Sequence, residues 1–274
     1  MKRRVRSGFT LVELLIVLGV IVLLVGLLMP AIGMARRSSN AAASQSNLKQ
    51  WGAATINYTT INKDRLPWEG KPASSDMVEN LLQTTFWANA VSVLVGERPY
   101  SKLVDNGVAG LDGIPLPGSR SVFIDPGADA EPDAPWQLGS GKAFYFNYVP
   151  NSRLNDSVAT PLHARSEVIS MHHIADSAAT VLMMEARSTN KEIPGADPYS
   201  GAALDLCQSD WHTFPNRYFE GGHVVFADGH VSHVLNDVAT RSFQGSRDPI
   251  QSGGDWNKPK LIWNPQGPAG NVAP

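Results

Sequence analysis

Residues 6–30 read RSGFTLVELLIVLGVIVLLVGLLMP, and this stretch decides the architecture of the chain. A short basic leader ends at Gly8, and an almost uninterrupted apolar stretch begins at Phe9. Across residues 9–32 the side chains are nearly all apolar, with one carboxylate, Glu13, close to the start. These about 24 residues make a helix of roughly 36 Å, longer than a hydrocarbon core of about 30 Å. The stretch therefore predicts a membrane-spanning helix.

Basic residues on either side of this stretch predict its orientation. Those before it are Lys2, Arg3, Arg4 and Arg6, and those after it are Arg36 and Arg37. Because the more positive flank stays in the cytoplasm, we expect the N-terminus inside and everything after Pro30 outside. An ordinary secretory signal is cleaved after its apolar stretch, whereas here the small residue Gly8 comes before it. Cleavage after Gly8 would leave the helix on the mature protein, with a new amine on Phe9.

The carboxylate of Glu13 needs a reason, because a charged side chain within a membrane span costs a few kcal/mol. One interpretation is a plain signal anchor in which Glu13 lies near the membrane interface without a role. A soluble core helix is a second interpretation, and the length and polarity of the stretch argue against it. The spacing favours a specialised anchor whose carboxylate has a function.

The sequence Gly8-Phe9-Thr10-Leu11-Val12-Glu13, followed by LLIV, resembles the processing site of type IV prepilins and type II secretion pseudopilins. The resemblance implies cleavage after Gly8, N-methylation of Phe9, and pairing of Glu13 with the N-terminus of a neighbouring subunit. The partners it implies are other pilin-like subunits, the prepilin peptidase and methylase, the inner-membrane assembly platform and membrane lipid. Pro30 falls where that family often has a helix-disrupting proline, so we expect the helix to kink or loosen there.

Three further segments resemble a subgroup of pilin-like proteins with long C-terminal domains. They are residues 47–52, the I-x-D-x3-T-x4-E stretch of residues 174–185, and residues 226–231 in a terminal hairpin. The subgroup is named for a His, nine residues, then Asp-Gly. This chain has Tyr218 in place of that His, and Asp125 where the subgroup commonly has a Cys before Pro.

The organisation of the chain predicts an α+β fold, in which a long N-terminal helix packs on a predominantly antiparallel β-sheet. We expect a leader at residues 1–8 and a helix over residues 9–61. The membrane span of this helix covers about 9–32, and its remainder is amphipathic, with apolar residues at three- and four-residue spacing. An extracytoplasmic globular domain follows over residues 62–274, with a tail rich in Gly and Pro from about residue 244.

The net charge and the cysteine count limit which partners we expect and how the outer domain can be stabilised. The formal net charge is −2, which gives no case for a nucleic-acid partner. The single cysteine, Cys207, has no intrachain partner for a disulfide, and we expect it to be buried. The outer domain must therefore be stabilised by its core.

Elements of the outer domain follow from local patterns. A helix is predicted over residues 77–95, and strands over residues 143–149 and 180–185. Residues 96–141 are dense in Gly and Pro and predict loops with short strands.

The clearest hairpin surrounds Asp228-Gly229, which predicts a two-residue turn. That register pairs Val224 with His233. It places His223 and His230 on one face of the hairpin and His233 on the other.

The histidines invite a zinc or catalytic interpretation, because all seven lie between His163 and His233. The predicted hairpin argues against it, since His223 and His230 would be roughly 13 Å apart along the strand. The adjacent His172 and His173 would diverge in an extended segment. No metal site is therefore predicted among the histidines.

Acidic residues give two weaker candidates. Asp125, Asp129 and Asp133 lie in an acidic loop, and some pseudopilins bind calcium in a loop of the globular domain, so these residues are weak calcium candidates. Asp176 and Glu185 invite a paired-carboxylate interpretation, although a turn aspartate and a strand-end glutamate are favoured. No other cofactor is expected.

The sequence predicts a non-enzymatic structural subunit of a type IV pilus or a type II secretion filament. Such a subunit lies in the inner membrane as a single-pass protein and enters a periplasmic or extracellular filament on assembly. One alternative keeps the anchor and makes the His-rich outer domain a binding module or metal-dependent enzyme, on the membrane or at a filament tip. Another is a plain membrane-anchored lectin-like domain, which would not be cleaved at Gly8.

Overall fold

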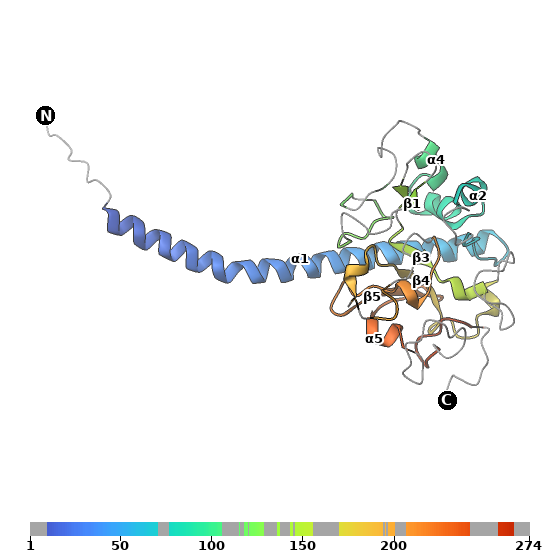
Figure 1. Ribbon diagram of the computed structural model, residues 1–274. Helices are drawn as coiled ribbons and strands as arrows, with labels where there is room; N and C mark the ends of the chain where they lie inside the picture. Colours follow the sequence, from blue (N-terminus) through green and yellow to red (C-terminus); the bar gives the residue numbers. More distant parts are fainter. Residues whose placement is uncertain are drawn as a thin grey trace. The chain divides into compact units, whose positions relative to one another are not determined.

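The computed structural model of the chain is shown in Figure 1. It describes residues 10–70, 77–105, 115, 118–119, 121–128, 136–137, 143–144, 146–155, 170–193, 195, 197–200, 207–241 and 257–265. The chain divides into two compact units, residues 1–40 and residues 41–274.

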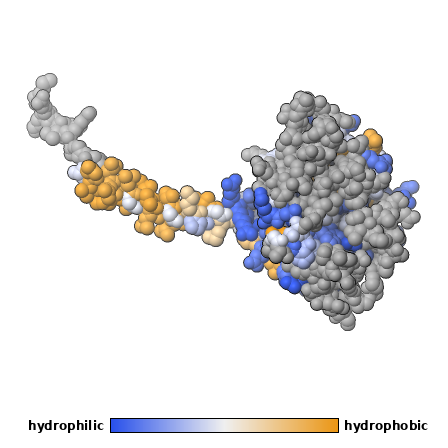
Figure 2. Space-filling model, viewed as in Figure 1, coloured by the Kyte–Doolittle hydropathy of each residue, from blue (hydrophilic) through white to orange (hydrophobic). Residues whose placement is uncertain are grey.

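A single long helix, α1 (Leu11–Ile61), dominates the first unit and continues into the second. The large apolar side chains between Leu11 and Met34 are exposed, from 44% at Val25 to 79% at Leu11. Figure 2 shows them as a continuous hydrophobic surface. In the described part of the chain, α1 is the one helix long and apolar enough to cross a membrane by length and composition. An apolar surface of this extent, facing no other part of its unit, is what a lipid-facing helix presents.

Pro30 lies inside α1 and does not interrupt it. Proline lacks the N–H that would bond to the carbonyl of Gly26, so one hydrogen bond of the helix is missing at this point. The hydrogen bonds on either side are enough to continue the helix.

The second part of α1 belongs to the outer unit and packs one face into its core. The buried positions recur at three- and four-residue spacing: Ala41, Ser44, Leu48, Trp51, Gly52, Ala54, Thr55 and Thr59. Gly52 allows a close approach to the sheet, because a Cβ there would lie 2.4 Å from Cγ2 of Val225. The helix ends where Lys63 and Asp64 take positive φ values of 57° and 66°.

The outer unit contains a four-stranded antiparallel sheet in the order β3-β4-β5-β6. The strands are β3 (Tyr148–Pro150), β4 (Val181–Glu185), β5 (Gly221–Phe226) and β6 (Val231–Leu235). A separate pair is formed by β1 (Trp136–Gln137) and β2 (Ala143–Phe144). The predicted α+β class and the strand over residues 180–185 are confirmed. The single strand predicted over residues 143–149 is wrong, because β2 and β3 belong to different sheets.

Short helices connect and cover these strands. They are α2 (Met77–Leu82), α3 (Trp87–Ala90), η2 (Ser92–Val95), α4 (Tyr100–Asp105), η3 (Ser152–Asn155), η4 (Met171–His173), η5 (Asn190–Glu192), η6 (Trp211–Thr213) and α5 (Asn236–Ala239). The single helix predicted over residues 77–95 is wrong. Backbone bonds to Trp68 from both sides of Phe86 interrupt it: Trp68 N–H donates to Thr85 at 2.9 Å, and Trp87 N–H donates to Trp68 at 2.8 Å.

The β5–β6 hairpin differs from its predicted register by one residue. The predicted register pairs His223 with Val234. In the structure His223 pairs with His233, because the turn holds an additional residue. Phe226 N–H donates to the carbonyl of His230 at 2.9 Å, and Gly229 has a φ of 89°. This is the three-residue hairpin loop that ends in a left-handed glycine. A one-residue slip moves side chains to the opposite face, so His223 and His233 share a face with ring centroids 5.5 Å apart.

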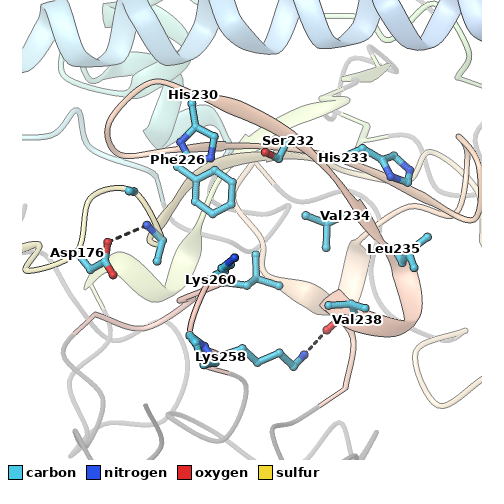
Figure 3. A pocket seen from close by; sticks show the side chains of 14 residues that line it. Asp176, Phe226, His230, Ser232, His233, Val234, Leu235, Val238, Lys258 and Lys260 are labelled. Atoms are coloured by element: carbon cyan, nitrogen blue, oxygen red, sulfur yellow. Dashed lines mark hydrogen bonds between the residues drawn. The ribbon is translucent and has the colours of Figure 1, made fainter. Parts of the chain in front are cut away.

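The predicted burial of Cys207 is confirmed, with 0% of the residue exposed. The described part of the tail packs on the core, because Trp263 is fully buried and Ile262 forms a parallel bridge with Thr180. Strand β6 is at the edge of the sheet, and Figure 3 shows a pocket beside it, faced by Lys258 and other residues of the tail.

Candidate functional site

The start of α1 carries the residues that the motif singles out. Gly8 and Phe9 lie outside the described residues. Thr10 stands directly before the helix, and its N–H and hydroxyl donate to Oε2 of Glu13 at 2.9 Å and 2.8 Å. In return, the N–H of Glu13 donates to the hydroxyl of Thr10 at 3.2 Å. This reciprocal pair is a capping box, with Thr10 as N-cap and Glu13 three residues later.

The capping box gives Glu13 a structural role that the sequence analysis missed. Its signal, Thr10 three residues before Glu13 at the start of an apolar run, is readable in the sequence. A carboxylate in the first turn is also favoured by the helix dipole. Both bonds from Thr10 use Oε2, so the carboxylate is oriented by its own helix and retains acceptor capacity for a further N–H donor.

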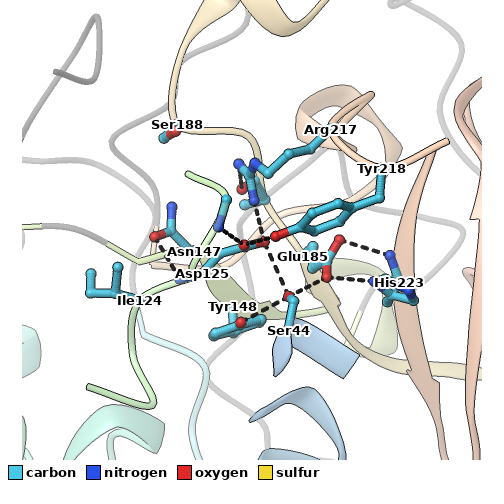
Figure 4. Close-up of polar contacts among 12 residues, drawn as sticks. Ser44, Ile124, Asp125, Asn147, Tyr148, Glu185, Ser188, Arg217, Tyr218 and His223 are labelled. Atoms are coloured by element: carbon cyan, nitrogen blue, oxygen red, sulfur yellow. Dashed lines mark hydrogen bonds and ion pairs between the residues drawn. The ribbon is translucent and has the colours of Figure 1, made fainter. Parts of the chain in front are cut away.

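A second constellation lies in the outer unit, between α1 and the sheet. We call it the buried polar cluster, and Figure 4 shows its contacts. Its members are Ser44, Asp125, Tyr148, Glu185, Arg217, Tyr218 and His223. They come from α1, from the loop before β1, from β3, β4 and β5, and from the turn before β5. Side chains from segments far apart in sequence therefore meet at one point.

Glu185 is one of the two carboxylates of this cluster, and 0% of it is exposed. The hydroxyl of Ser44 donates to its Oε1 at 2.5 Å. His223 contacts it twice, through its N–H to Oε2 at 2.8 Å and through Nδ1 to Oε1 at 2.7 Å. Gly222 leaves room for the carboxylate, because a Cβ there would lie 2.9 Å from Oε2. Glu185 is therefore a link between helix and sheet and more than a residue at the end of a strand.

Asp125 is the other carboxylate, and it too is 0% exposed. Its oxygens accept from the guanidinium of Arg217, the hydroxyl of Tyr218 and the N–H of Gly127, the last at 2.8 Å. Arg217 also binds Glu192 at 2.8 Å. Burial alone would lower the pKa of Arg217, but Asp125 and Glu192 raise it well above its ordinary value. The guanidinium therefore stays charged and balances the buried carboxylates.

Two tyrosines complete the cluster as hydrogen-bond donors. Burial, with Asp125 and Glu185 nearby, raises the pKa of Tyr148 well above its ordinary value. Burial and Asp125 also raise the pKa of Tyr218. Both phenols stay protonated over the whole physiological pH range, so Tyr218 can donate to Asp125 and Tyr148 can share a hydrogen bond with the hydroxyl of Ser44.

The cluster contains Ser, His and Glu, yet its geometry does not activate a nucleophile. The hydroxyl of Ser44 donates directly to the carboxylate of Glu185, whereas a nucleophilic serine needs a base that accepts its proton. Ser44, Glu185 and His223 are 0%, 0% and 5% exposed, so substrate has no access to them in this arrangement. The contact between Ser44 and Glu185 docks α1 on the sheet.

Asp176 lies apart from Glu185, in a turn. Its Oδ1 accepts the N–H of Ala179 at 3.1 Å, and its carbonyl accepts the hydroxyl of Thr180 at 2.6 Å. The N–H of Ala227 donates to Thr180 at 2.9 Å, so this turn also positions the β5–β6 loop. The interpretation of Asp176 as a turn residue is confirmed, and the paired-carboxylate interpretation is wrong.

The histidines have separate partners. His172 and His173 do not diverge, because they lie in a 3-10 helix with ring centroids 4.1 Å apart. His172 Nδ1 contacts Asp64 at 2.8 Å, on the surface. Within the described residues, no group of three His, Cys, Asp or Glu side chains is placed to hold a metal ion. His163 lies outside those residues.

Of the three calcium candidates, Asp125 lies among the described residues. Asp125 already binds a guanidinium, so it would have to release Arg217 before serving a cation. Asp129 and Asp133 lie outside the described residues, and calcium binding by the acidic loop stays a prediction.

Comparison with known proteins concerns the residues around the start of α1. A family model, described as the prokaryotic N-terminal methylation motif, matches residues 3–29. This range contains the leader, the junction between Gly8 and Phe9, the capping box and most of the apolar stretch. The match supports a type IV pilin or pseudopilin family, with processing and methylation at the N-terminus and anchoring in a membrane. Comparison with curated proteins and with solved structures gave no match.

Proposed function

We propose that this chain is a non-enzymatic subunit of a type IV pilus or type II secretion filament. Prepilin peptidase cleaves it after Gly8, and the new N-terminus, Phe9, is methylated. The observation that carries the proposal is the match of residues 3–29 to the methylation motif, at the start of an exposed apolar helix. The subunit waits in the inner membrane with its N-terminus inside and its outer domain outside.

Assembly exchanges lipid for neighbouring helices. The apolar side chains from Leu11 to Met34 are exposed in the single subunit and would contact the same segment of other subunits in a filament core. When assembly moves the helix out of the membrane, Glu13 leaves the membrane interface, and its charge then needs a partner in the filament core. The ammonium of Phe9 on a neighbouring subunit supplies that partner, and the capping box holds the carboxylate ready for it. One polar pair in an apolar bundle also fixes the register between subunits.

The outer domain is linked to the helix by the buried polar cluster. Since the hydroxyl of Ser44 donates to Glu185 at 2.5 Å, pulling on α1 would be transmitted to the sheet through this buried hydrogen bond. A filament subunit needs such a joint, because extraction from the membrane acts on the helix while the outer domain moves with it.

Processing of leader variants tests the proposal. In cells that hold an active prepilin peptidase, the wild-type chain should lose residues 1–8, whereas Gly8→Leu should keep them. The matched control is Ser7→Ala, a substitution at the neighbouring position, and this variant should be processed like the wild type. Normal removal of the leader from Gly8→Leu would refute cleavage after Gly8.

A further inference from the structure

The free edge of the sheet forms one wall of a groove in the outer domain. Strand β6 ends the order β3-β4-β5-β6, so one of its edges has no neighbouring strand among the described residues. A groove of about 870 Å³ lies beside it, and Ser232, His233, Val234 and Leu235 all line this groove (Figure 3). Side chains alternate between the two faces of a strand. Four consecutive residues therefore line one groove because the backbone edge itself is the wall.

Two hydrogen bonds establish which backbone groups of β6 face this groove. Phe226 N–H donates to the carbonyl of His230 at 2.9 Å, at one end of the hairpin. Asn236 N–H donates to the carbonyl of Glu220 at 2.8 Å, at the other end. Along an antiparallel pair, hydrogen-bonded positions alternate with non-bonded ones. The even-numbered residues of β6 thus bond to β5, and the odd-numbered residues face outward.

The outward groups are the N–H and C=O of Val231 and His233 and the N–H of Leu235. Within the described part of the chain, none of these groups has a hydrogen-bond partner. A row of unpaired groups on an edge strand is a template for an added strand.

The side chains around the groove define what kind of strand fits. Leu235 and Val238 are 45% and 43% exposed, which gives the groove an apolar wall. Lys260 is exposed and has no ion pair within the described residues. The one carboxylate lining the groove belongs to Asp176, which already accepts the N–H of Ala179. Lys258 also lines the groove, so two lysines face one carboxylate and positive charge exceeds negative charge along this wall.

We propose that the groove binds an extended acidic segment of a partner polypeptide, which adds to β6 as a further strand. Backbone hydrogen bonds to Val231, His233 and Leu235 hold the segment, and a carboxylate on the face of the added strand that borders the groove reaches Lys260. The volume falls within the range of about 300–1,000 Å³ that is usual for ligand sites. This inference concerns the outer domain and is independent of filament assembly.

Two synthetic octapeptides, capped at both ends, test the proposal on the full chain in detergent micelles. One alternates Glu with Val and the other alternates Lys with Val, so they share strand propensity and differ in charge. We expect the acidic peptide to bind at least about tenfold more tightly at low salt. Hydrogen exchange should show fast amides at positions 231, 233 and 235 in the free chain and protection of these amides by the acidic peptide.

A proline variant separates strand addition from other modes of binding. Leu235 has a φ of −66°, which proline adopts without strain, and its N–H lies outside the β5–β6 ladder. Leu235→Pro should therefore fold and bind the acidic peptide about tenfold more weakly, whereas Leu235→Ala should bind nearly as the wild type does. Lys260→Glu should reverse the preference between the two peptides.

Several outcomes would overturn the proposal. Equal binding of both peptides, or of Leu235→Pro and Leu235→Ala, would exclude an acidic added strand. Slow exchange of amides 231, 233 and 235 in the free chain would show that the edge is already covered. In that case, a dependence on protein concentration would identify a second copy as the cover, and its absence would identify another segment of this chain.

Discussion

The hydroxyl of Tyr218 donates a hydrogen bond to the carboxylate of Asp125, and both side chains are buried. These are the two positions at which the chain departs from the pattern of the subgroup it resembles. Arg217, the residue next to Tyr218, binds the same carboxylate. The two departures therefore meet in one cluster, where a carboxylate at position 125 finds the donors that its burial requires.

Removing the hydroxyl of Tyr218 should destabilise the outer domain. Tyr218→Phe keeps the ring and leaves buried Asp125 with one donor fewer, so we expect a loss of about 1–3 kcal/mol in the free energy of unfolding. Urea unfolding of the full chain in detergent micelles, followed by tryptophan fluorescence, measures this loss. Asp125→Asn and the double variant complete a cycle. The double variant should lose about 1 kcal/mol less than the sum of the two single losses, and strict additivity would contradict the pairing.

A methyl group at Gly52 should separate α1 from the sheet. Gly52→Ala favours the helix by about 1 kcal/mol, but the new Cβ would lie 2.4 Å from Cγ2 of Val225 and 3.3 Å from its Cβ and Cγ1. Rotation about χ1 of Val225 leaves its Cβ at 3.3 Å, so we expect a net loss of about 1–3 kcal/mol. Gly33→Ala is the matched control, because no atom lies within 4 Å of its added Cβ. A stability gain in Gly52→Ala would show that the helix docks less closely.

The surface pair of Asp64 and His172 gives a prediction for pH. Hydrogen bonds from the N–H and ring of His172 lower the pKa of Asp64 below its ordinary value. A lowered carboxylate pKa in the folded state stabilises the fold above the unfolded pKa of about 3.9, and this contribution is lost as pH falls through the folded pKa. Carboxyl chemical shifts of Asp64 should titrate below the ordinary midpoint, and His172→Ala should move the midpoint upward. An unchanged midpoint in that variant would contradict the contact.

The carboxylate of Glu13 should matter for assembly and not for insertion. Glu13→Ala removes a costly charge from the span, so the variant should reach the membrane at wild-type levels. Its incorporation into filaments, measured by shearing and immunoblotting, should fall by about tenfold or more, because the partner ammonium would be left without its counter-charge. Thr10→Val, which breaks the capping box and keeps the carboxylate, should cause a smaller fall. Equal falls in filament incorporation would show that Glu13 acts only through the capping box at the start of α1.

The elements that could be predicted from the sequence are those that depend on a local pattern of residues. The apolar run after Phe9 predicted α1, and the β-rich runs around Asp228-Gly229 predicted a hairpin. The register of that hairpin was predicted wrongly, because the loop holds one more residue than an Asp-Gly turn, and each slip exchanges the faces. The capping box of Thr10 and Glu13 was readable from spacing and was missed.

The buried polar cluster was beyond sequence-based prediction for a different reason. Its members lie far apart in the sequence, with 141 positions between Ser44 and Glu185, and only the packing of helix on sheet brings them together. A buried carboxylate looks like a surface residue in the sequence until its donors are known, and here the donors come from α1 and β5.

Processing of this chain to a pilin-like subunit is tested most directly by the mass of the mature protein. We would purify the full-length product from its native membrane and determine its intact mass and its N-terminal residue. We predict a chain that lacks residues 1–8 and begins at Phe9 with one added methyl group on its amine. A chain that still begins at Met1, in cells with an active prepilin peptidase, would contradict processing and reduce α1 to an ordinary membrane anchor.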